Sequence, residues 1–154
     1  MDSIETIIHT HGDMLLRISL CLLGNEKDAE DAVQETLLKY IQKAPRFENE
    51  IKEKAWLVTV VTNQCRDMLR ARIRHPKVEL EAIQHFSMEK EELGIMEALM
   101  KLPEKFKTVL LLHYVEEYKV EEIARIIGKT PSAVKMRLQK GRKLLEEKYR
   151  KEFL

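Results

Sequence analysis

The chain has 154 residues, of which 44% are hydrophobic and 34% are charged, and its formal net charge is only +1. This length fits one medium domain or two small ones, and this composition is that of a folded protein with highly charged helices. The acidic N-terminal stretch MDSIETII is unlike a signal peptide, and the longest apolar run, VLLL, is too short to span a bilayer. We therefore expect a cytoplasmic protein.

The small net charge conceals alternating blocks of opposite sign. The formal net charge is −5 for residues 1–50 and +5 for residues 51–78. It is −5 for residues 79–100 and +6 for residues 101–154. This alternation predicts two basic surfaces, with separate roles for the acidic ones.

An all-α fold is predicted, because only five Gly and four Pro occur and apolar residues mostly recur at three- and four-residue spacing. A first helix is expected at residues 4–23, and Asn25 can cap the next one through its side-chain oxygen. That second helix, at about residues 26–43, begins with acidic turns, as the helix dipole favours, and has an apolar stripe that reaches Ile41. A loop, PRFENE, precedes a long helix at about residues 52–74.

The pattern predicts two small helical domains, residues 1–75 and residues 95–154. Residues 76–94 between them are acidic and less periodic, so we expect an interdomain linker there, with room for a short helix. Helices of the second domain are expected at about residues 95–101, 103–117, 120–127 and 131–151.

The last two helices have the layout of a helix-turn-helix. VEEIARIIG is a short amphipathic helix that Gly128 ends. Thr130 can cap the next helix, and Pro131 suits its first position because the proline ring pre-sets φ. A short helix, a tight turn with Gly and a basic helix together favour binding to duplex DNA.

The segment GKTPSAVKMRLQKGRK carries six Lys or Arg and no acidic residue. A helix that is merely solvated more often mixes acidic and basic residues in i, i+4 pairs. We therefore favour phosphate contact over solubility as the explanation of this excess of basic residues. At 100° per residue, one side of this helix is apolar and the other is polar. A helix in the major groove reads bases from its first turns and contacts phosphates further along. The predicted base contacts are Ser132, Lys135, Met136 and Gln139, and the predicted phosphate contacts are Lys140, Arg142 and Lys143.

Two blocks of this sequence resemble the extracytoplasmic-function (ECF) RNA polymerase sigma factors of bacteria. LGNEKDAEDAVQETLLKY and AWLVTVVTNQCRDMLRARIR resemble their conserved second region, and KLPEKFKTVLLLHYVEEYKVEEIARIIGKTPSAVKMRLQKGRKLL resembles their fourth. Members are two-domain, all-helical promoter-specificity subunits. The resemblance implies binding to core RNA polymerase, through the β′ clamp and the β flap, and to promoter DNA. It also implies an anti-sigma factor, often tethered to the membrane.

The resemblance assigns a role to the acidic second helix. In this family that helix binds the clamp coiled coil of the β′ subunit, and the matching residues here are Asp31, Gln34 and Glu35. These lie at i, i+3 and i+4, so they share one face and can receive Arg side chains from a partner. Outside this family, a solvated acidic face would be the simpler explanation.

The loop PRFENE and the following helix correspond to the family's elements that open the −10 promoter element. Opening requires a base held outside the stack and cations along the single strand. The loop offers Phe47 as a stacking surface and Asn49 for hydrogen bonds. The helix offers Asn63, Arg66, Arg70, Arg72 and Arg74, of which all but Arg72 are the predicted −10 contacts.

Two further residues are expected to be structural, and a third departs from the family's pattern. Asp67 fits the family pattern N-x3-D-x2-R, but it lies among arginines and is expected to pair with Arg70 or Arg66. Trp56 is expected in the core. Gly141 stands where the family commonly has Ala, and Gly inside a helix costs about 1 kcal/mol relative to Ala.

Catalysis is not expected. The histidines are scattered and make no zinc-type spacing with Cys21 or Cys65, and there is no P-loop or glycine-rich dinucleotide turn. We therefore expect no cofactor, no metal and no small-molecule substrate, and we expect the cysteines to be apolar packing residues. Two alternatives stay open, namely a stand-alone helix-turn-helix regulator that binds palindromic sites and a protein-binding module whose basic helix meets an acidic partner.

Overall fold

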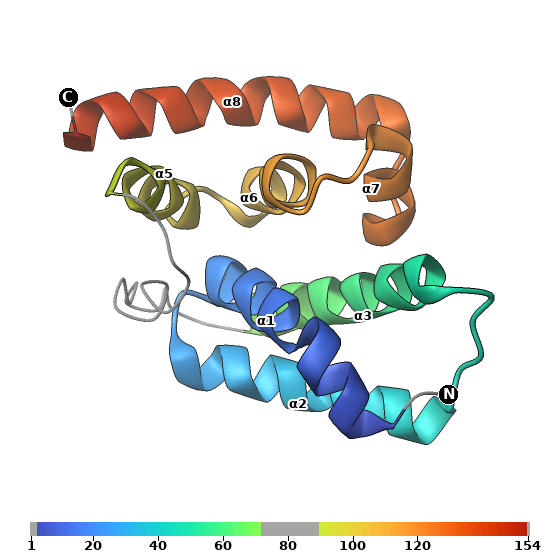
Figure 1. Cartoon of the computed structure of the whole chain (residues 1–154). Coiled ribbons are helices and arrows are strands. Elements are labelled where there is room, and N and C mark those ends of the chain that lie inside the picture. The colour runs from blue at the N-terminus through green and yellow to red at the C-terminus, as the bar shows by residue number, and fades with distance from the viewer. Residues whose placement is uncertain (1–2, 72–89, 154) are drawn as a thin grey trace.

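The computed structural model describes residues 3–71 and 90–153, and within these ranges the chain is helical with no strand (Figure 1). The prediction of an all-α fold is confirmed. The helices of the N-terminal half are α1 (Ile4–Leu23), α2 (Glu26–Lys43) and α3 (Glu50–Ala71). Those of the C-terminal half are α5 (Lys90–Met100), α6 (Glu104–Leu110), the π-helical turn η1 (Leu111–Val115), α7 (Val120–Ile127) and α8 (Pro131–Phe153).

Local capping chemistry sets several helix ends. The Asn25 side-chain oxygen accepts a hydrogen bond from the Asp28 backbone N–H at 2.9 Å, which confirms the predicted cap of α2. The Thr130 hydroxyl accepts one from the Ala133 N–H at 3.1 Å and caps α8 in the same way. Gly128 ends α7 with a φ of 68°, a left-handed conformation that glycine adopts without steric cost.

The structure differs from the predicted boundaries in two places. The helix expected at residues 95–101 begins earlier, at Lys90, because the acidic turn before it continues the helix despite its weak apolar periodicity. The single helix expected at residues 103–117 is divided into α6 and η1. Residues 72–89, which hold most of the predicted linker and the end of the third predicted helix, lie outside the described residues.

The two halves pack against each other and share one apolar core. Helix α1 packs on α2 and α3, and α8 runs along α5, α6 and α7, as Figure 1 shows. Helix α3 also packs against α6 and α7, while α1 packs against α5 and α6. The buried apolar side chains of both halves form a continuous cluster. The halves of this structure are therefore in contact.

Three small residues fit close to their neighbours in this core. Cys21 and Cys65 are fully buried, as predicted for packing residues, and burial raises the pKa of Cys21 to about 12, so that its thiol stays protonated at neutral pH. Gly141 lies where α8 packs tightly on α6, because a Cβ atom there would lie only 3.1 Å from the Leu110 Cδ1 atom. The stability lost through the low helix propensity of Gly141 is thus offset by tight packing between α8 and α6.

Two glycine-to-alanine substitutions should have opposite effects on stability. Gly12 lies inside α1, and a Cβ atom there would make only an ordinary contact of 3.7 Å with Ile8. Gly12→Ala should therefore raise the free energy of unfolding by about 1 kcal/mol through helix propensity. Gly128→Ala should lower it by about 1 kcal/mol, because alanine is strained at positive φ. Urea unfolding of both variants checks this, and a stabilising Gly128→Ala would contradict the described turn.

Candidate nucleic-acid and polymerase interfaces

The helix-turn-helix is built by the packing of α7 on α8. Val134 and Leu138 are 0% and 3% exposed and fix the inner side of α8, as the helical periodicity predicted. The Lys119 N–H donates to the Glu122 carboxylate at 2.9 Å and closes the start of α7. These contacts orient the outer side of α8 towards solvent.

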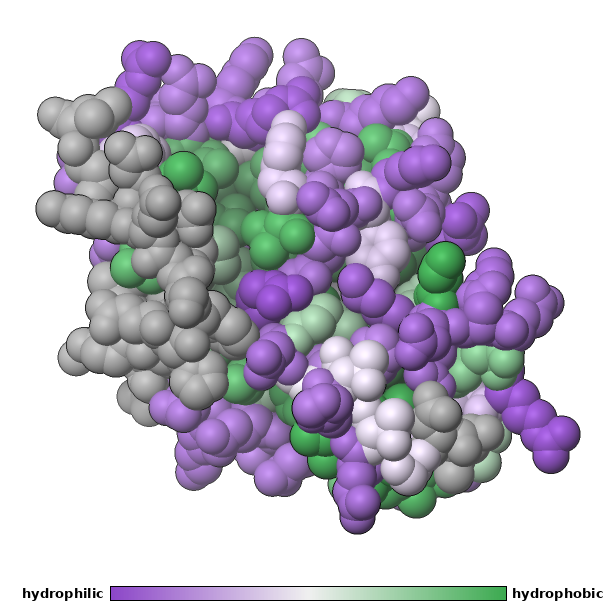
Figure 2. Space-filling model, in the orientation of Figure 1, coloured by the Kyte–Doolittle hydropathy of each residue, from purple (hydrophilic) through white to green (hydrophobic). Residues whose placement is uncertain are grey.

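All seven residues predicted on the outer side of α8 are exposed, and Met136 is 71% exposed. Figure 2 shows hydrophilic residues along the edge of the molecule that α8 occupies in Figure 1. The exposed set comprises Ser132, Lys135, Met136, Gln139, Lys140, Arg142 and Lys143. The structure thus brings these residues together on one accessible surface, although their contacts with DNA stay a prediction.

Aromatic side chains of the preceding elements position two of these cations. The Arg142 guanidinium donates a hydrogen bond to the Tyr114 hydroxyl of η1 at 3.0 Å. The Lys140 ammonium lies 5.5 Å from the centre of the Phe106 ring. Tyr114 is 54% exposed and its ring packs edge-on against His113. Sequence reasoning missed Tyr114, because a tyrosine inside an apolar helical stretch carries no signal that it reaches the recognition helix.

The outer face of α2 presents an acid, an amide and two aliphatic side chains. Asp31 and Gln34 are exposed and Glu35 is half-buried, so the predicted polar face exists. Leu38 and Ile41 are 48% and 51% exposed. The expectation that Ile41 belongs to the buried stripe is wrong, because Tyr40 already fills the inner side of this last turn.

The loop before α3 is anchored at both ends. The Phe47 ring is half-buried, with its centre 6.0 Å from that of Trp56, and Trp56 in turn lies 5.9 Å from Tyr40. Trp56 packs against the core from a half-buried position, close to the expected role. The Asn49 side-chain oxygen accepts a hydrogen bond from the Lys52 N–H at 2.9 Å and caps α3, so this oxygen is already engaged within the protein.

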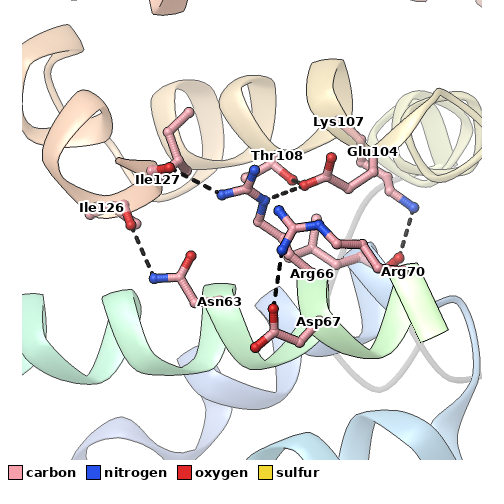
Figure 3. A network of polar contacts seen from close by, with 10 residues as sticks. Asn63, Arg66, Asp67, Arg70, Glu104, Lys107, Thr108, Ile126 and Ile127 are labelled. Carbon is pink, nitrogen blue, oxygen red and sulfur yellow. Dashed lines mark hydrogen bonds and ion pairs between the residues drawn. The ribbon is translucent and has the colours of Figure 1, made fainter. Parts of the chain in front are cut away.

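The predicted −10 residues of α3 do not share one exposed surface (Figure 3). The Asn63 side-chain amide donates to the Ile126 carbonyl at 3.1 Å, and Arg66, only 6% exposed, forms an ion pair with Glu104. Both side chains point towards the C-terminal half, because α6 and α7 offer a carboxylate and the unpaired carbonyls at a helix end.

The other two predicted −10 residues of this region are Arg70 and Arg74. Arg70 is exposed and pairs with Asp67 at 3.1 Å, which confirms the structural role expected for Asp67. Arg74 lies outside the described residues.

Two kinds of feature are absent from the described residues. None of their helices is both long and apolar enough to cross a bilayer. Within the same residues, no group of three or more His, Cys, Asp or Glu side chains could hold a metal ion.

Comparison with known proteins assigns the chain to a class. Residues 7–75 match the family described as Sigma-70 region 2, and residues 92–154 match Sigma-70, region 4. The chain is 31% identical over 153 residues to RNA polymerase sigma factor SigV of Bacillus subtilis. This match covers 97% of this chain and 92% of that protein. It belongs to the RNA polymerase sigma factors, the subunits that direct core RNA polymerase to promoters.

The ECF group is the particular family within this class. ECF RNA polymerase sigma factor SigW of Bacillus subtilis is 26% identical, over 97% of this chain and 90% of that protein. ECF sigma factor SigE of Mycolicibacterium smegmatis is 27% identical, over 96% of this chain and 62% of that protein. The chain is an ECF sigma factor, as its sequence motifs predicted, and not a stand-alone regulator.

Two solved structures share the fold. The structure of CnrH in complex with the cytosolic domain of CnrY has a TM-score of 0.71 at 23% identity, over 97% of this chain and 88% of that chain. The sigma factor RpoE, in complex with the anti-sigma factor NepR from Bartonella quintana, has a TM-score of 0.72 at 22% identity, over 96% of this chain and 97% of that chain.

The lysines of α8 give a quantitative prediction. If Lys140 and Lys143 each contact a phosphate, Lys140→Ala and Lys143→Ala should each reduce the slope of log affinity for duplex DNA against log salt by about 0.9. Titrations at several salt concentrations measure this slope. Lys151→Ala, at the far exposed end of α8, serves as the control and should leave it unchanged. Equal slopes for all three variants and the parent chain would show that these lysines face solvent in the complex.

Proposed function

We propose that this sigma factor binds core RNA polymerase through the outer face of α2, reads −35 duplex DNA with α8, and opens the −10 element with the loop at residues 44–49 and α3. The observation that carries this assignment is the placement of two chemically different exposed faces on opposite sides of the molecule, α8 above and α2 below in Figure 1. One face is basic, as DNA requires, and the other mixes acidic and aliphatic side chains, as a protein partner requires.

The α2 face has the composition of a protein interface. Asp31, Gln34, Leu38 and Ile41 follow one another at helical spacing, so a carboxylate and an amide lie in line with two exposed aliphatic side chains. A clamp that carries arginine can pair with the carboxylate, while the aliphatic side chains bury apolar surface. The family resemblance names the β′ clamp coiled coil as this partner.

The α8 face suits the −35 duplex. Its first turns expose Ser132, Lys135, Met136 and Gln139 for the bases, and Lys140, Arg142 and Lys143 follow for the phosphates. Tyr114 supports this role, because its hydroxyl holds the Arg142 guanidinium in one orientation before DNA arrives. The region 4 domain that carries α8 would also meet the β flap.

The −10 element needs a stacking surface and cations. Phe47 rests on Trp56, which holds the ring at the surface as a platform for an unstacked base. Arg70 is exposed and available to a strand, whereas Asn63 and Arg66 must first leave the C-terminal half. Asn49 would contact DNA only through its amide nitrogen, because its oxygen caps α3.

An anti-sigma factor is proposed as the regulator. RpoE of Bartonella quintana, which shares this fold, is a sigma factor in complex with the anti-sigma factor NepR, and CnrH is in complex with the cytosolic domain of CnrY. By analogy this chain would work in the cytoplasm, held by an anti-sigma factor that can itself be membrane-tethered. It would catalyse no reaction of its own, because RNA polymerase carries out the chemistry.

Binding to core polymerase tests the proposal. The double variant Asp31→Ala, Gln34→Ala should weaken the affinity of the purified chain for bacterial core RNA polymerase by about tenfold or more, as truncation at the centre of an interface does. Both residues are exposed, so the circular dichroism spectrum should not change.

The control is Glu147→Ala, which removes an exposed acidic charge from α8 and should leave polymerase affinity unaltered. Equal affinity of the double variant and the parent chain would place the polymerase contact elsewhere.

A further inference from the structure

Three polar side chains lie together in the core of the N-terminal half, one from each of its helices. His11 of α1 and Glu53 of α3 are each 6% exposed, and Tyr40 of α2 is fully buried. The Tyr40 hydroxyl donates a hydrogen bond to the Oε2 atom of Glu53 at 3.1 Å. The His11 Nε2 atom lies 3.7 Å from the Oε1 atom. The Glu53 carboxylate thus faces a different residue at each of its oxygen atoms.

The two contacts of Glu53 differ in kind. At 3.7 Å the contact with His11 is longer than a hydrogen bond, so it has little directional preference. Among the described residues, none forms a hydrogen bond with the His11 Nε2 atom. The Tyr40 hydroxyl is within hydrogen-bond distance, and a hydrogen bond to a carboxylate is both strong and directional. Tyr40 is therefore the side chain whose orientation Glu53 fixes.

Core packing alone does not account for a carboxylate at position 53. Burial of a charged group is costly, and apolar side chains in place of a buried charged pair often leave stability unchanged or improved. Glu53 lies four positions before Leu57, which is fully buried, so an apolar residue would continue the buried side of α3. The carboxylate therefore indicates a role besides filling the core.

Tyr40 connects this carboxylate to the loop that precedes α3. The Tyr40 ring packs edge-on against Trp56, with the ring centres 5.9 Å apart and the ring planes at 70°. Trp56 in turn contacts the half-buried Phe47, with 6.0 Å between the ring centres and 59° between the planes. Because aromatic contacts depend on the angle between the rings, the orientation of Tyr40 constrains Trp56, and Trp56 constrains Phe47.

The backbone of Glu53 belongs to the same connection. Its N–H donates a hydrogen bond to the Asn49 carbonyl at 3.2 Å, within the first turn of α3. The Asn49 side chain caps this turn. Glu53 therefore fixes the end of the loop through its backbone and the series of aromatic rings through its side chain.

We propose that Glu53 is a positioning residue for the −10 element, which acts through Tyr40 and Trp56 to hold the Phe47 ring at the angle that a stacked base requires. The proposal rests on the proposed role of Phe47 as the platform for an unstacked base. Glu53 itself contacts no DNA, because it is buried beneath the loop. A ring that is held in place beforehand loses less conformational entropy when the strand binds, and the affinity is higher for that reason.

Single-strand binding by the complex of this chain with bacterial core RNA polymerase tests the proposal. The probe is a fluorescently labelled strand of about 12 nucleotides of mixed sequence, since stacking on an aromatic ring tolerates every base. Phe47→Ala measures the contribution of the platform and should weaken binding about tenfold. Glu53→Leu and Tyr40→Phe should each weaken binding about threefold or more, because both remove the hydrogen bond while a side chain of similar size remains.

Two comparisons distinguish positioning from a general effect on the fold. Glu53→Gln keeps an oxygen atom that can accept the Tyr40 hydroxyl, so its affinity should lie within about twofold of the parent chain. In the double variant Phe47→Ala, Glu53→Leu the two losses should not add, because the carboxylate acts only through the ring. The matched control is Glu50→Leu, the same change at an exposed position in the first turn of α3, which should keep the affinity of the parent chain.

Fluorescence of the free chain provides a second readout. Trp56 is the single tryptophan of the sequence, so its emission reports the aromatic series directly. Tyr40→Phe and Glu53→Leu should each change the emission intensity of Trp56 and its quenching by acrylamide, whereas Glu50→Leu should change neither. Emission and quenching equal to those of the parent chain in both variants would show that the hydrogen bond does not position Trp56.

The DNA-binding outcomes separate this proposal from the role proposed for Phe47. If Phe47→Ala binds the strand as the parent chain does, the platform and the positioning role of Glu53 are both wrong. If Phe47→Ala weakens binding while Glu53→Leu and Tyr40→Phe match the parent chain, Phe47 keeps its role and positioning by Glu53 is refuted. Additive losses in the double variant would also overturn positioning. Glu53→Leu and Tyr40→Phe remove the same hydrogen bond from opposite sides, so the result does not depend on the folding of one variant.

Discussion

The ion pair between Arg66 and Glu104 is the interaction on which the described arrangement most depends. It brings a buried cation of the N-terminal half against a carboxylate of the C-terminal half, and burial makes the loss of either partner costly. The apolar cluster that continues from one half to the other has no directional preference of its own. The polar contacts around Arg66 therefore select the register in which α3 meets α6 and α7.

This arrangement explains why a DNA-binding protein can have a net charge of only +1. The basic residues of α8 remain exposed, whereas two of the polar residues of α3 are turned inwards by the other half. The acidic N-terminal segment adds repulsion towards phosphates, so that the isolated chain should bind DNA weakly. Core polymerase would supply the missing affinity by engaging α2 and by favouring the separated halves.

Local chemistry made much of the fold predictable from the sequence. The caps at Asn25 and Thr130 and the left-handed turn at Gly128 depend on neighbouring residues alone. The outer face of α8 follows from helical periodicity, because Val134 and Leu138 define its inner side. The assignment to ECF sigma factors likewise depended on contiguous motifs.

The features that could not be predicted from the sequence depend on contacts between residues that are distant in the chain. Nothing near Arg66 indicates that Glu104, 38 positions away, will pair with it. The exposure of Ile41 could not be predicted, because an apolar residue on a helical stripe is ordinarily buried. The contact of Tyr114 with the recognition helix could not be predicted either, because its partner Arg142 lies on another helix. The capping role of Asn49 could not be predicted, because it depends on where α3 begins.

The most direct test is a structure of this chain bound to core RNA polymerase and a promoter with an opened −10 element. We expect α2 to contact the β′ clamp, the two halves to be separated, and the Arg66 guanidinium to have moved from Glu104 to the single strand. A complex in which α3 still packs on α6 and α7, with Arg66 paired to Glu104 beside an opened promoter, would contradict the proposed −10 role of Arg66.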